Sequence, residues 1–265
     1  MKKVSVLVMT YNNIYNLKRT LECVEEQDYP NTEVVIADGG STDGTVEFLR
    51  KYAERTRCEV KWVSESDKGL YDALNKDIRM ATGDYLLVCN DQYISNSAIS
   101  KLVAAVQSGN YDGAHCDLIY ASEEEVKRYW HMGKGNIRQG WLPGHPTLLL
   151  KREVYEKYGM YDDTFKIAAD YEFMVRILKD DEVKLAYVPE ILVRMYYGGT
   201  STNGVRSYLD SIWEGHVALT RNGVKGAVVI DFVRILRVFF QFINRRKAAN
   251  VWNNYQHQNS KRVGE

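Results

Sequence analysis

Short apolar segments alternate with helical patterns through the first third of the sequence. The segments typical of buried strands are residues 4–9, 33–37, 60–63 and 85–89. The segments with helical patterns are residues 14–27, 45–54 and 70–81. Such alternation predicts β-α-β units, and therefore an α/β fold with a mostly parallel sheet between helices. The later pattern predicts helices at 95–108, 152–159 and 170–179 and strands at 116–121, 147–151 and 184–194.

Polar and acidic residues follow each of the first three predicted strands. The three segments are Thr10-Tyr11-Asn12-Asn13, Asp38-Gly39-Gly40-Ser41-Thr42-Asp43-Gly44-Thr45 and Ser64-Glu65-Ser66-Asp67. The alternative is that Asp and Gly merely shape turns here, for backbone reasons. In an open parallel sheet, however, ligands bind outside the carboxyl ends of the strands. Three polar strand ends together therefore favour a binding site.

The composition limits the classes of protein to which the chain can belong. Its 265 residues suffice for one large α/β domain. With 35 basic and 35 acidic residues the formal net charge is zero, so nothing indicates a nucleic-acid partner. The 4 cysteines are scattered without a C-x-x-C pair, which argues against a zinc site and indicates reduced, cytosolic thiols. The first apolar run is too short for a signal peptide, so we expect a cytoplasmic protein.

Two motifs in the usual order carry a family resemblance. The turn Asp38 to Thr45 has the pattern D-G-G-S-x-D-G-T, and residues 65–76 read E-S-D-K-G-L-Y-D-A-L-N-K. Over roughly its first three quarters the chain resembles bacterial inverting glycosyltransferases of family two. This resemblance implies a GT-A domain over residues 1–205. It also implies a nucleotide-sugar donor, with UDP favoured, and a glycan or lipid-linked acceptor in polysaccharide or lipopolysaccharide biosynthesis.

The resemblance assigns the donor site to residues near these motifs. It places Asp38 at the uracil or ribose, Asp67 at the base, and Asp72 and Asn75 near the donor sugar and diphosphate. Further candidates for nucleotide-sugar binding are Thr10, Tyr11, Asn12, Lys68, Asn90 and His145. Lys68 would offer a fixed positive charge to the pyrophosphate, although a solvated surface lysine is the commoner case. His145, in a His-Pro-Thr segment, would touch the diphosphate, metal or acceptor, or else be structural.

The expected metal motif is atypical. Relatives carry an acidic triplet after the fourth strand. The matching segment here is Cys89-Asn90-Asp91-Gln92-Tyr93, with Gln92 or Tyr93 at the position of the metal-binding Asp. Asp91, the only carboxylate in this stretch, is the predicted ligand for Mn²⁺ or Mg²⁺ because hard cations prefer charged oxygens. Two alternatives remain: weak binding through substrate phosphates with Asn90 or Gln92, or loss of metal dependence or activity. The last would make the chain a catalytically impaired nucleotide-sugar or glycan-binding relative.

The candidate catalytic base lies in the segment Ala168-Ala169-Asp170-Tyr171-Glu172. Relatives carry their base at this point, and that match assigns the role to Asp170. A helix N-terminus favours an ionised carboxylate there. The alternative is a helix cap and nothing more. Glu172 would orient Asp170 or the acceptor. Many processive relatives carry a Q-x-x-R-W segment after the base. Because no such segment follows here, we expect addition of a single sugar.

The last part of the sequence changes character and forms a separate predicted region, 206–265. Residues 225–247 place apolar side chains on one helical face with basic flanks. Arg234 and Arg237 interrupt the apolar run, which makes a membrane-spanning helix improbable. The pattern fits a helix lying on the inner face of the cytoplasmic membrane. A helix docked on the domain's own core or on a second copy, in a homo-oligomer, is the alternative.

Overall fold

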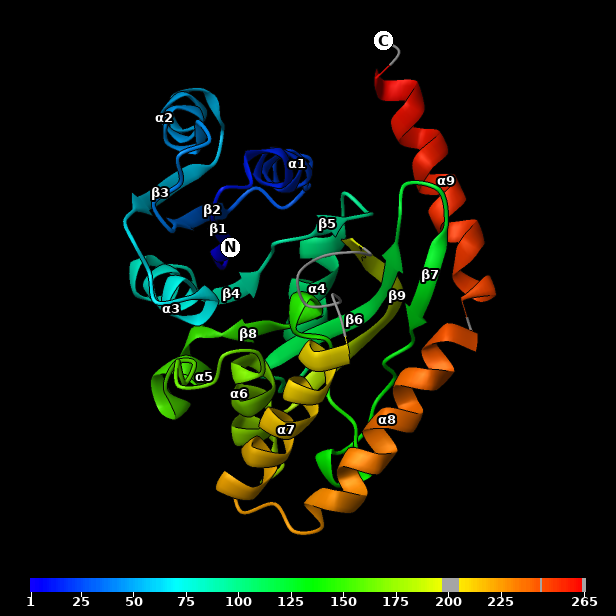
Figure 1. The fold of residues 1–265 in the computed structure, drawn as a ribbon. Coiled ribbons are helices and arrows are strands. Elements are labelled where there is room, and N and C mark those ends of the chain that lie inside the picture. Colours follow the sequence, from blue (N-terminus) through cyan, green and yellow to red (C-terminus); the bar gives the residue numbers. More distant parts are fainter. Residues whose placement is uncertain (197–204, 244, 264–265) are drawn as a thin grey trace.

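The computed structural model describes residues 1–196, 205–243 and 245–263 and shows a curled, mostly parallel sheet flanked by helices (Figure 1). The strands are β1 (Val4–Thr10), β2 (Thr32–Asp38), β3 (Glu59–Ser64), β4 (Tyr85–Val88), β5 (Gln92–Tyr93), β6 (Gly113–Ala121), β7 (Val126–Trp130), β8 (Leu149–Lys151) and β9 (Leu185–Tyr196). The helices are α1 (Ile14–Glu25), α2 (Thr45–Arg55), α3 (Leu70–Met80), α4 (Ala98–Gln107), α5 (Arg152–Tyr158), α6 (Ala169–Leu178), α7 (Val205–Arg221), α8 (Ala227–Ile243) and α9 (Arg246–Val263). Short 3-10 helices cover Ile137–Gln139 and His145–Thr147.

The strand order is β3-β2-β1-β4-β8-β6-β9-β5, with β7 paired to β6. The first four strands in this order are parallel, as the β-α-β pattern predicted. The sheet then becomes mixed, because β8 runs antiparallel to both β4 and β6. The predicted strand at 116–121 is longer in the structure, and β7 follows it as a hairpin partner that the sequence pattern did not indicate.

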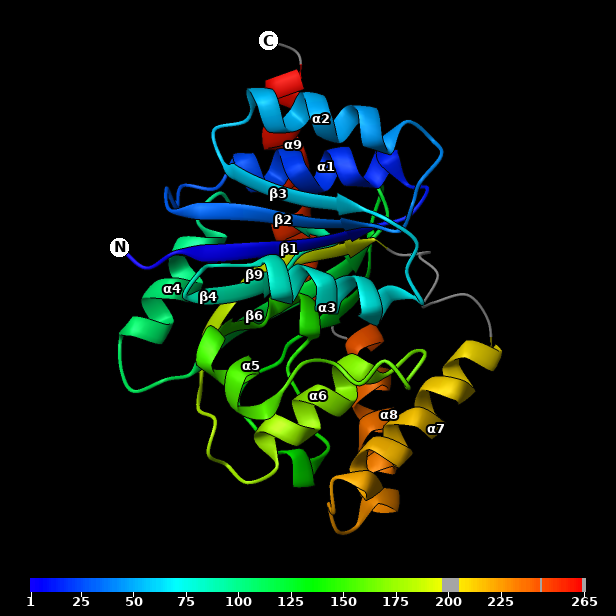
Figure 2. The same cartoon turned by 90° about the vertical axis from the view of Figure 1, so that its left-hand side faces the viewer.

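Both faces of the sheet are covered (Figure 2). Because side chains alternate along a strand, Val6 and Val8 of β1 pack toward α1 and Leu7 packs toward α3. Figure 2 shows α1 and α2 on one face and α3, α5 and α6 on the other. This arrangement leaves the carboxyl ends of β1, β2 and β3 at a single edge of the sheet.

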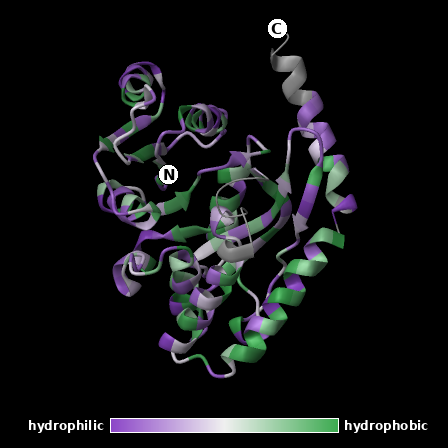
Figure 3. Cartoon of the chain, in the orientation of Figure 1, coloured by the Kyte–Doolittle hydropathy of each residue, from purple (hydrophilic) through white to green (hydrophobic). Residues whose placement is uncertain are grey.

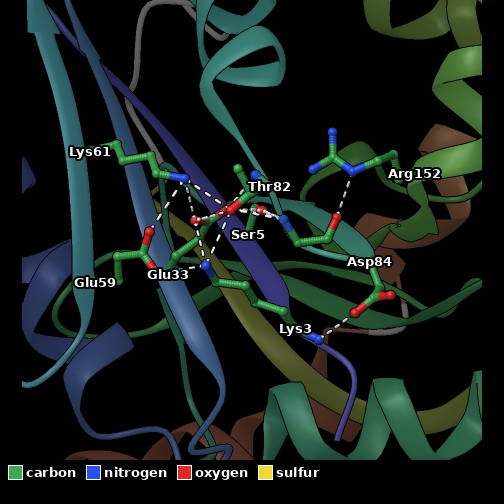
Figure 4. Close-up of polar contacts among 9 residues, drawn as sticks. Lys3, Ser5, Glu33, Glu59, Lys61, Thr82, Asp84 and Arg152 are labelled. Carbon is green, nitrogen blue, oxygen red and sulfur yellow. Dashed lines mark hydrogen bonds and ion pairs between the residues drawn. The ribbon is translucent and has the colours of Figure 1, made fainter.

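A buried glutamate links the strands near their amino ends, opposite the carboxyl ends just described (Figure 4). Glu33 of β2 accepts hydrogen bonds from Ser5 Oγ at 2.5 Å and from Thr82 Oγ1 at 2.8 Å. Lys61 Nζ lies 2.9 Å and Lys3 Nζ 3.0 Å from Oε2 of Glu33. Burial opposes the charge of Glu33, but these contacts outweigh it and hold the pKa of the carboxyl well below its usual range. The network therefore clamps β1, β2, β3 and the start of β4.

The C-terminal helices share the core of the rest of the chain. Ala218 and Leu219 of α7 are buried in the same cluster as Phe173 of α6. Ala248 and Trp252 of α9 pack against the β6–β7 hairpin. The helix predicted at 225–247 is α8, which has one buried face and one exposed face.

The outer face of α8 is apolar and exposed to solvent (Figure 3). Ile230 is buried against the core, whereas Val228, Phe232 and Phe239 are 73%, 63% and 62% exposed. Within residues 1–196, 205–243 and 245–263, no helix combines the length and hydrophobicity needed to span a bilayer. The exposed face is therefore a surface feature of the structure.

Candidate active site

Asp38 lies at the carboxyl end of β2 and is almost completely buried. Its Oδ1 accepts a hydrogen bond from Ser41 Oγ at 2.5 Å, and its Oδ2 accepts one from Ser64 Oγ at 2.5 Å. Ser41 belongs to the following turn, and Ser64 ends β3. Asp38 is therefore a fixed carboxylate that joins two strand ends.

The turn after β1 is bound directly to the turn after β2. Asn12 has a φ of +46°, a left-handed conformation that Asn tolerates better than most residues. Its backbone N–H donates to Ser41 Oγ at 2.7 Å, and its side-chain Oδ1 accepts from Thr42 N at 2.8 Å. Thr10 is buried, whereas the side chain of Tyr11 is 64% exposed. Of Thr10 and Tyr11, Tyr11 is therefore the residue whose side chain is open to solvent.

Asp67, in the loop after β3, lies against the end of β2. A Cβ added to Gly39 would lie 2.7 Å from Asp67 Oδ2 and 3.1 Å from a ring carbon of Tyr11. Only a glycine allows this close approach. The structure therefore brings Tyr11, Asp38 and Asp67 to one edge, as predicted from the three strand ends.

Several polar side chains in the segment after Asp67 bond to neighbouring protein groups. Asp72 Oδ2 accepts the backbone N–H of Lys68 at 3.1 Å and lies 3.7 Å from Lys76 Nζ. Asn75 is buried, and its amide bonds to both backbone groups of Tyr161, at 2.9 and 3.0 Å. The structure thus places Asn75 as a link between α3 and the loop before α6, with its polar atoms turned away from the strand ends.

A cavity of about 1090 Å³ extends from these strand ends toward α7 and α8. Of the predicted site residues, Asn90, Asp91, His145 and Asp170 line it. The other predicted residues lie outside its lining: Thr10, Tyr11, Asn12, Asp38, Asp67, Lys68, Asp72, Asn75 and Glu172. Some predicted residues therefore lie at the strand ends and others in the cavity, whereas Asn75 and Glu172 belong to neither group.

Asp170 occupies the first turn of α6, whose N-cap is Ala168. Oδ1 of Asp170 lies 3.0 Å from the Tyr71 hydroxyl, which also donates to the Ile167 carbonyl at 2.6 Å. Tyr71 belongs to the second sequence motif, so this contact joins that motif to Asp170. Burial, together with the charge of Asp170, raises the pKa of Tyr71, which keeps the hydroxyl protonated as a donor.

The loop that leads into α6 is held by Glu214 of α7. Its carboxylate accepts the backbone N–H groups of Lys166 at 3.1 Å, Ile167 at 2.9 Å and Ala168 at 2.9 Å. These donors lie immediately before Asp170, where a helix start leaves N–H groups without intrahelical partners. Glu214 thus caps α6 from another helix and fixes the position of Asp170. No sequence pattern indicated this role.

Glu172 points away from the cavity. Its Oε2 lies 2.8 Å from Arg176 NH2, and its Oε1 accepts from Asn222 Nδ2 at 3.1 Å. Residues two apart on a helix do not share a face. The structure therefore separates Glu172 from Asp170 and gives it a contact between α6 and the residues after α7.

Asp91 is half-buried and lines the cavity. Burial raises the pKa of its carboxyl to about 7, against the opposing effects of the Tyr196 N–H and Arg194. Gln92, by contrast, offers Oε1 to Arg194 NH1 at 2.5 Å, and Asn90 offers Oδ1 to Met9 N at 3.0 Å. Asp91 is thus the carboxylate of this stretch that lines the cavity. The described residues contain no cluster of three or more His, Cys, Asp or Glu side chains suited to a metal.

His145 and Asp170 lie close enough to interact electrostatically. Burial lowers the pKa of His145, and the charge of Asp170 opposes this shift. His145 Nε2 lies 2.7 Å from the Tyr161 hydroxyl. A neutral imidazole in this position can accept or donate one hydrogen bond toward the cavity.

Arginines on α1 and β9 complete the wall around Asp91. Arg194 is 2% exposed and lies 3.1 Å from Glu123, which also pairs with Arg19 at 2.9 Å. The sequence patterns did not identify these residues. Arg194 stands in an otherwise apolar strand pattern, a buried charge that is uncommon unless paired. That local mismatch was the signal available in the sequence.

The sequence matches a known protein family. The description "Glycosyl transferase family 2" belongs to a family model that matches residues 5–171, well over half of the chain. The chain belongs to glycosyl transferase family 2. The matched region contains both sequence motifs, Asp91, His145 and Asp170.

This family 2 glycosyltransferase has relatives among curated proteins. A PGL/p-HBAD biosynthesis glycosyltransferase of Mycobacterium bovis is 25% identical over 212 residues, covering 74% of this chain and 78% of the relative. The poly(ribitol-phosphate) beta-N-acetylglucosaminyltransferase TarS of Staphylococcus aureus is 27% identical over 197 residues. That match covers 72% of this chain and 30% of TarS.

Solved structures of similar fold are also glycosyltransferases. Residues 1–349 of S. aureus TarS in complex with UDP match with a TM-score of 0.65 and 16% identity, over 88% of this chain and 69% of that one. The mannosyltransferase PcManGT of Pyrobaculum calidifontis, with GDP-Man and Mn²⁺, matches with a TM-score of 0.63 and 18% identity, over 89% and 74%. The glycosyltransferase described here therefore has the GT-A fold.

Proposed function

We propose that this glycosyltransferase transfers one sugar from a UDP-sugar to a glycan or lipid-linked acceptor in cell-surface polysaccharide biosynthesis, with inversion. The observation that carries the proposal is the position of Asp170. It lines the cavity at a helix start, beside Tyr71 of the donor motif, and Asp91 lines the same cavity. A carboxylate held there is available to accept a proton from an acceptor hydroxyl bound in the cavity.

The proposed reaction is a single displacement. The Asp170 carboxylate accepts the proton of an acceptor hydroxyl while that oxygen forms a bond to the anomeric carbon. The bond from this carbon to the diphosphate oxygen breaks, and UDP leaves with the electron pair. Attack from the side opposite the leaving group inverts the anomeric centre. Tyr71 and Glu214 hold Asp170 in place, and His145 lies beside it as a hydrogen-bonding group.

The donor would lie along the strand ends. Asp38 and Asp67 would bind the ribose and base, with Tyr11 beside them, and the diphosphate would extend toward Asn90 and Asp91. UDP in the TarS complex supports a uridine nucleotide, although the PcManGT complex contains GDP-Man and Mn²⁺. A divalent cation, held by Asp91 together with the diphosphate, would neutralise charge on the leaving group.

Hydrolysis and transfer assays with a panel of UDP- and GDP-sugars test this proposal. The assays would use manganese, magnesium or chelator with wild type, Asp170→Asn and the exposed control Asp163→Asn. We expect nucleotide release from one donor, a loss of roughly 100-fold or more in Asp170→Asn, and no change in the control. Full activity in Asp170→Asn would refute the assignment of the base. Donor binding without turnover in the presence of a range of acceptors would favour the catalytically impaired relative.

We also propose that α8 rests on the surface of a membrane. Its outer face carries exposed Phe232 and Phe239, and Arg221, Lys225 and Arg245 lie exposed near its two ends. Apolar side chains flanked by cations suit the interface of an anionic bilayer. The inner leaflet of the cytoplasmic membrane is the surface we propose, and residues 206–265 form the associating region. Because Ile230 on the inner face of α8 is buried, the outer face is the one available for this contact.

A further inference from the structure

The cavity that holds Asp170 carries more positive charge than its carboxylates balance. Its lining includes these arginines from the described part of the chain: Arg19, Arg128, Arg194, Arg234 and Arg237. Arg19 and Arg194 pair with Glu123, and Arg234 lies 3.0 Å from Asp231. Arg128 and Arg237 form no ion pair within the described residues, and they belong to β7 and α8.

Arg128 of β7 is half-buried in an aromatic surrounding. Its guanidinium carbon lies 4.4 Å from the ring centre of Tyr120, 5.6 Å from that of Trp130 and 5.7 Å from that of Phe242. Its Nε donates to Gln241, while the terminal amino groups have no acceptor among the described residues. Cation–π contacts offset part of the cost of burying the cation. The free amino groups of a half-buried arginine of this kind would gain charge-assisted hydrogen bonds to an anion.

Arg237, an exposed residue of α8, lines the same cavity. Its Nε donates to the Gln139 carbonyl at 3.3 Å, and Gln241 follows one helical turn later on the same side. Because Gln241 bonds to Arg128, it lies between the two arginines. Gln241 is itself buried. Arg128 and Arg237 therefore both lie near the side chain of Gln241.

We propose that Arg128 and Arg237 form an anion subsite that binds a phosphate group of the acceptor. Two guanidinium groups offer paired donors that match phosphate oxygens. Ile235, Val238 and Phe240 of α8 line the same cavity and would contact apolar atoms next to that phosphate. This inference rests on the proposed function, since it assigns the acceptor side of the same site. The acceptor would be a phosphorylated lipid or a soluble phosphate ester.

The test measures phosphate binding with the donor site filled. The full chain is saturated with UDP, and binding of glycerol phosphate and of monomeric dodecyl phosphate is followed by calorimetry at low salt. The variants are Arg128→Gln, Arg128→Lys and Arg237→Gln, with the exposed Arg138→Gln as the matched control. Thermal unfolding and UDP affinity are measured for each variant. These readouts separate loss of the fold from loss of the subsite.

We expect each Gln variant to weaken phosphate binding about tenfold, with UDP affinity and the control unchanged. Arg128→Lys, which keeps the charge without the planar fork, should lie between. Dodecyl phosphate binding tenfold more tightly than glycerol phosphate would identify a lipid phosphate, and equal affinities a soluble one; both support the subsite. UDP binding without phosphate binding, or phosphate binding unchanged in the Gln variants, would overturn it. Failure to bind any nucleotide would instead contradict the proposed function.

Discussion

The Tyr71 hydroxyl lies 3.0 Å from Oδ1 of Asp170, although 99 positions separate them in sequence. Tyr71 belongs to α3 and Asp170 to α6, so the contact joins the two halves of the fold. The hydroxyl shares its hydrogen between Asp170 and the Ile167 carbonyl. Tyr71 is therefore a positioning residue, and it orients the proposed base toward the cavity.

Removing this hydroxyl should slow the reaction more than it weakens donor binding. In Tyr71→Phe we expect kcat to fall roughly 10- to 100-fold, because a small displacement of a reacting group is costly. Donor affinity should stay within a factor of about two. Tyr158→Phe, which removes a hydroxyl bonded to exposed Glu182, is the control. Equal losses in kcat and donor affinity would contradict a positioning role.

Glu214→Ala should also lower kcat, through the loop before α6. Three backbone N–H groups lose their acceptor in this variant. We expect stability to fall by about 1–3 kcal/mol, the usual cost of unsatisfied polar groups. Urea unfolding and transfer kinetics would measure both effects. Unchanged kcat in a folded Glu214→Ala protein would show that the clamp does not position Asp170.

Gly39→Ala should weaken donor binding while leaving the fold intact. The added Cβ meets the flexible end of Asp67 at 2.7 Å, so the Asp67 carboxylate must move. We expect UDP affinity to fall about tenfold, the effect of losing one charged hydrogen bond. Gly109→Ala, which displaces only the Tyr111 ring, is the control. Wild-type UDP affinity in Gly39→Ala would exclude Asp67 from the nucleotide site.

Glu33 should make stability sensitive to acid. Its pKa is lowered in the folded state, so its stabilising effect is complete above the ordinary value of 4.5 and disappears as the pH falls through the folded pKa. Glu33→Gln should therefore lose about 2–3 kcal/mol at pH 7 and show a weaker pH dependence below about pH 4.5. Glu59→Gln, whose side chain is 52% exposed, should change little. Parallel acid curves for wild type and Glu33→Gln would contradict this.

The exposed face of α8 should bind anionic vesicles. We expect wild type to sediment with phosphatidylglycerol vesicles at low salt, and Phe232→Ser with Phe239→Ser to remain in the supernatant. Neither phenylalanine lines the cavity, so nucleotide hydrolysis should persist in the double variant. A double exchange at exposed, polar positions of α2, Glu47→Ser with Arg50→Ser, is the control. Sedimentation of the Phe variant equal to that of wild type would contradict the membrane proposal.

The sequence by itself determined the elements whose signals are local. Alternating apolar runs and helical stripes specify β-α-β units, because strand and helix periodicities are properties of neighbouring residues. Parallel strands then bring their carboxyl ends to one edge, so the order of strands and helices along the chain was enough to place Asp38 and Asp67 together. The family motifs added Asp91, His145 and Asp170, which do line one cavity.

Only the tertiary structure decided which side chains those residues meet. Asn75 bonds to Tyr161, 86 positions later, and Glu172 turns toward Arg176 because it lies on another face of α6 than Asp170. Glu214 reaches the start of α6 from a different helix. These contacts depend on how helices and strands pack, which no local pattern encodes. For the same reason, only the packing of β7 and α8 brings Arg128 and Arg237 to one cavity.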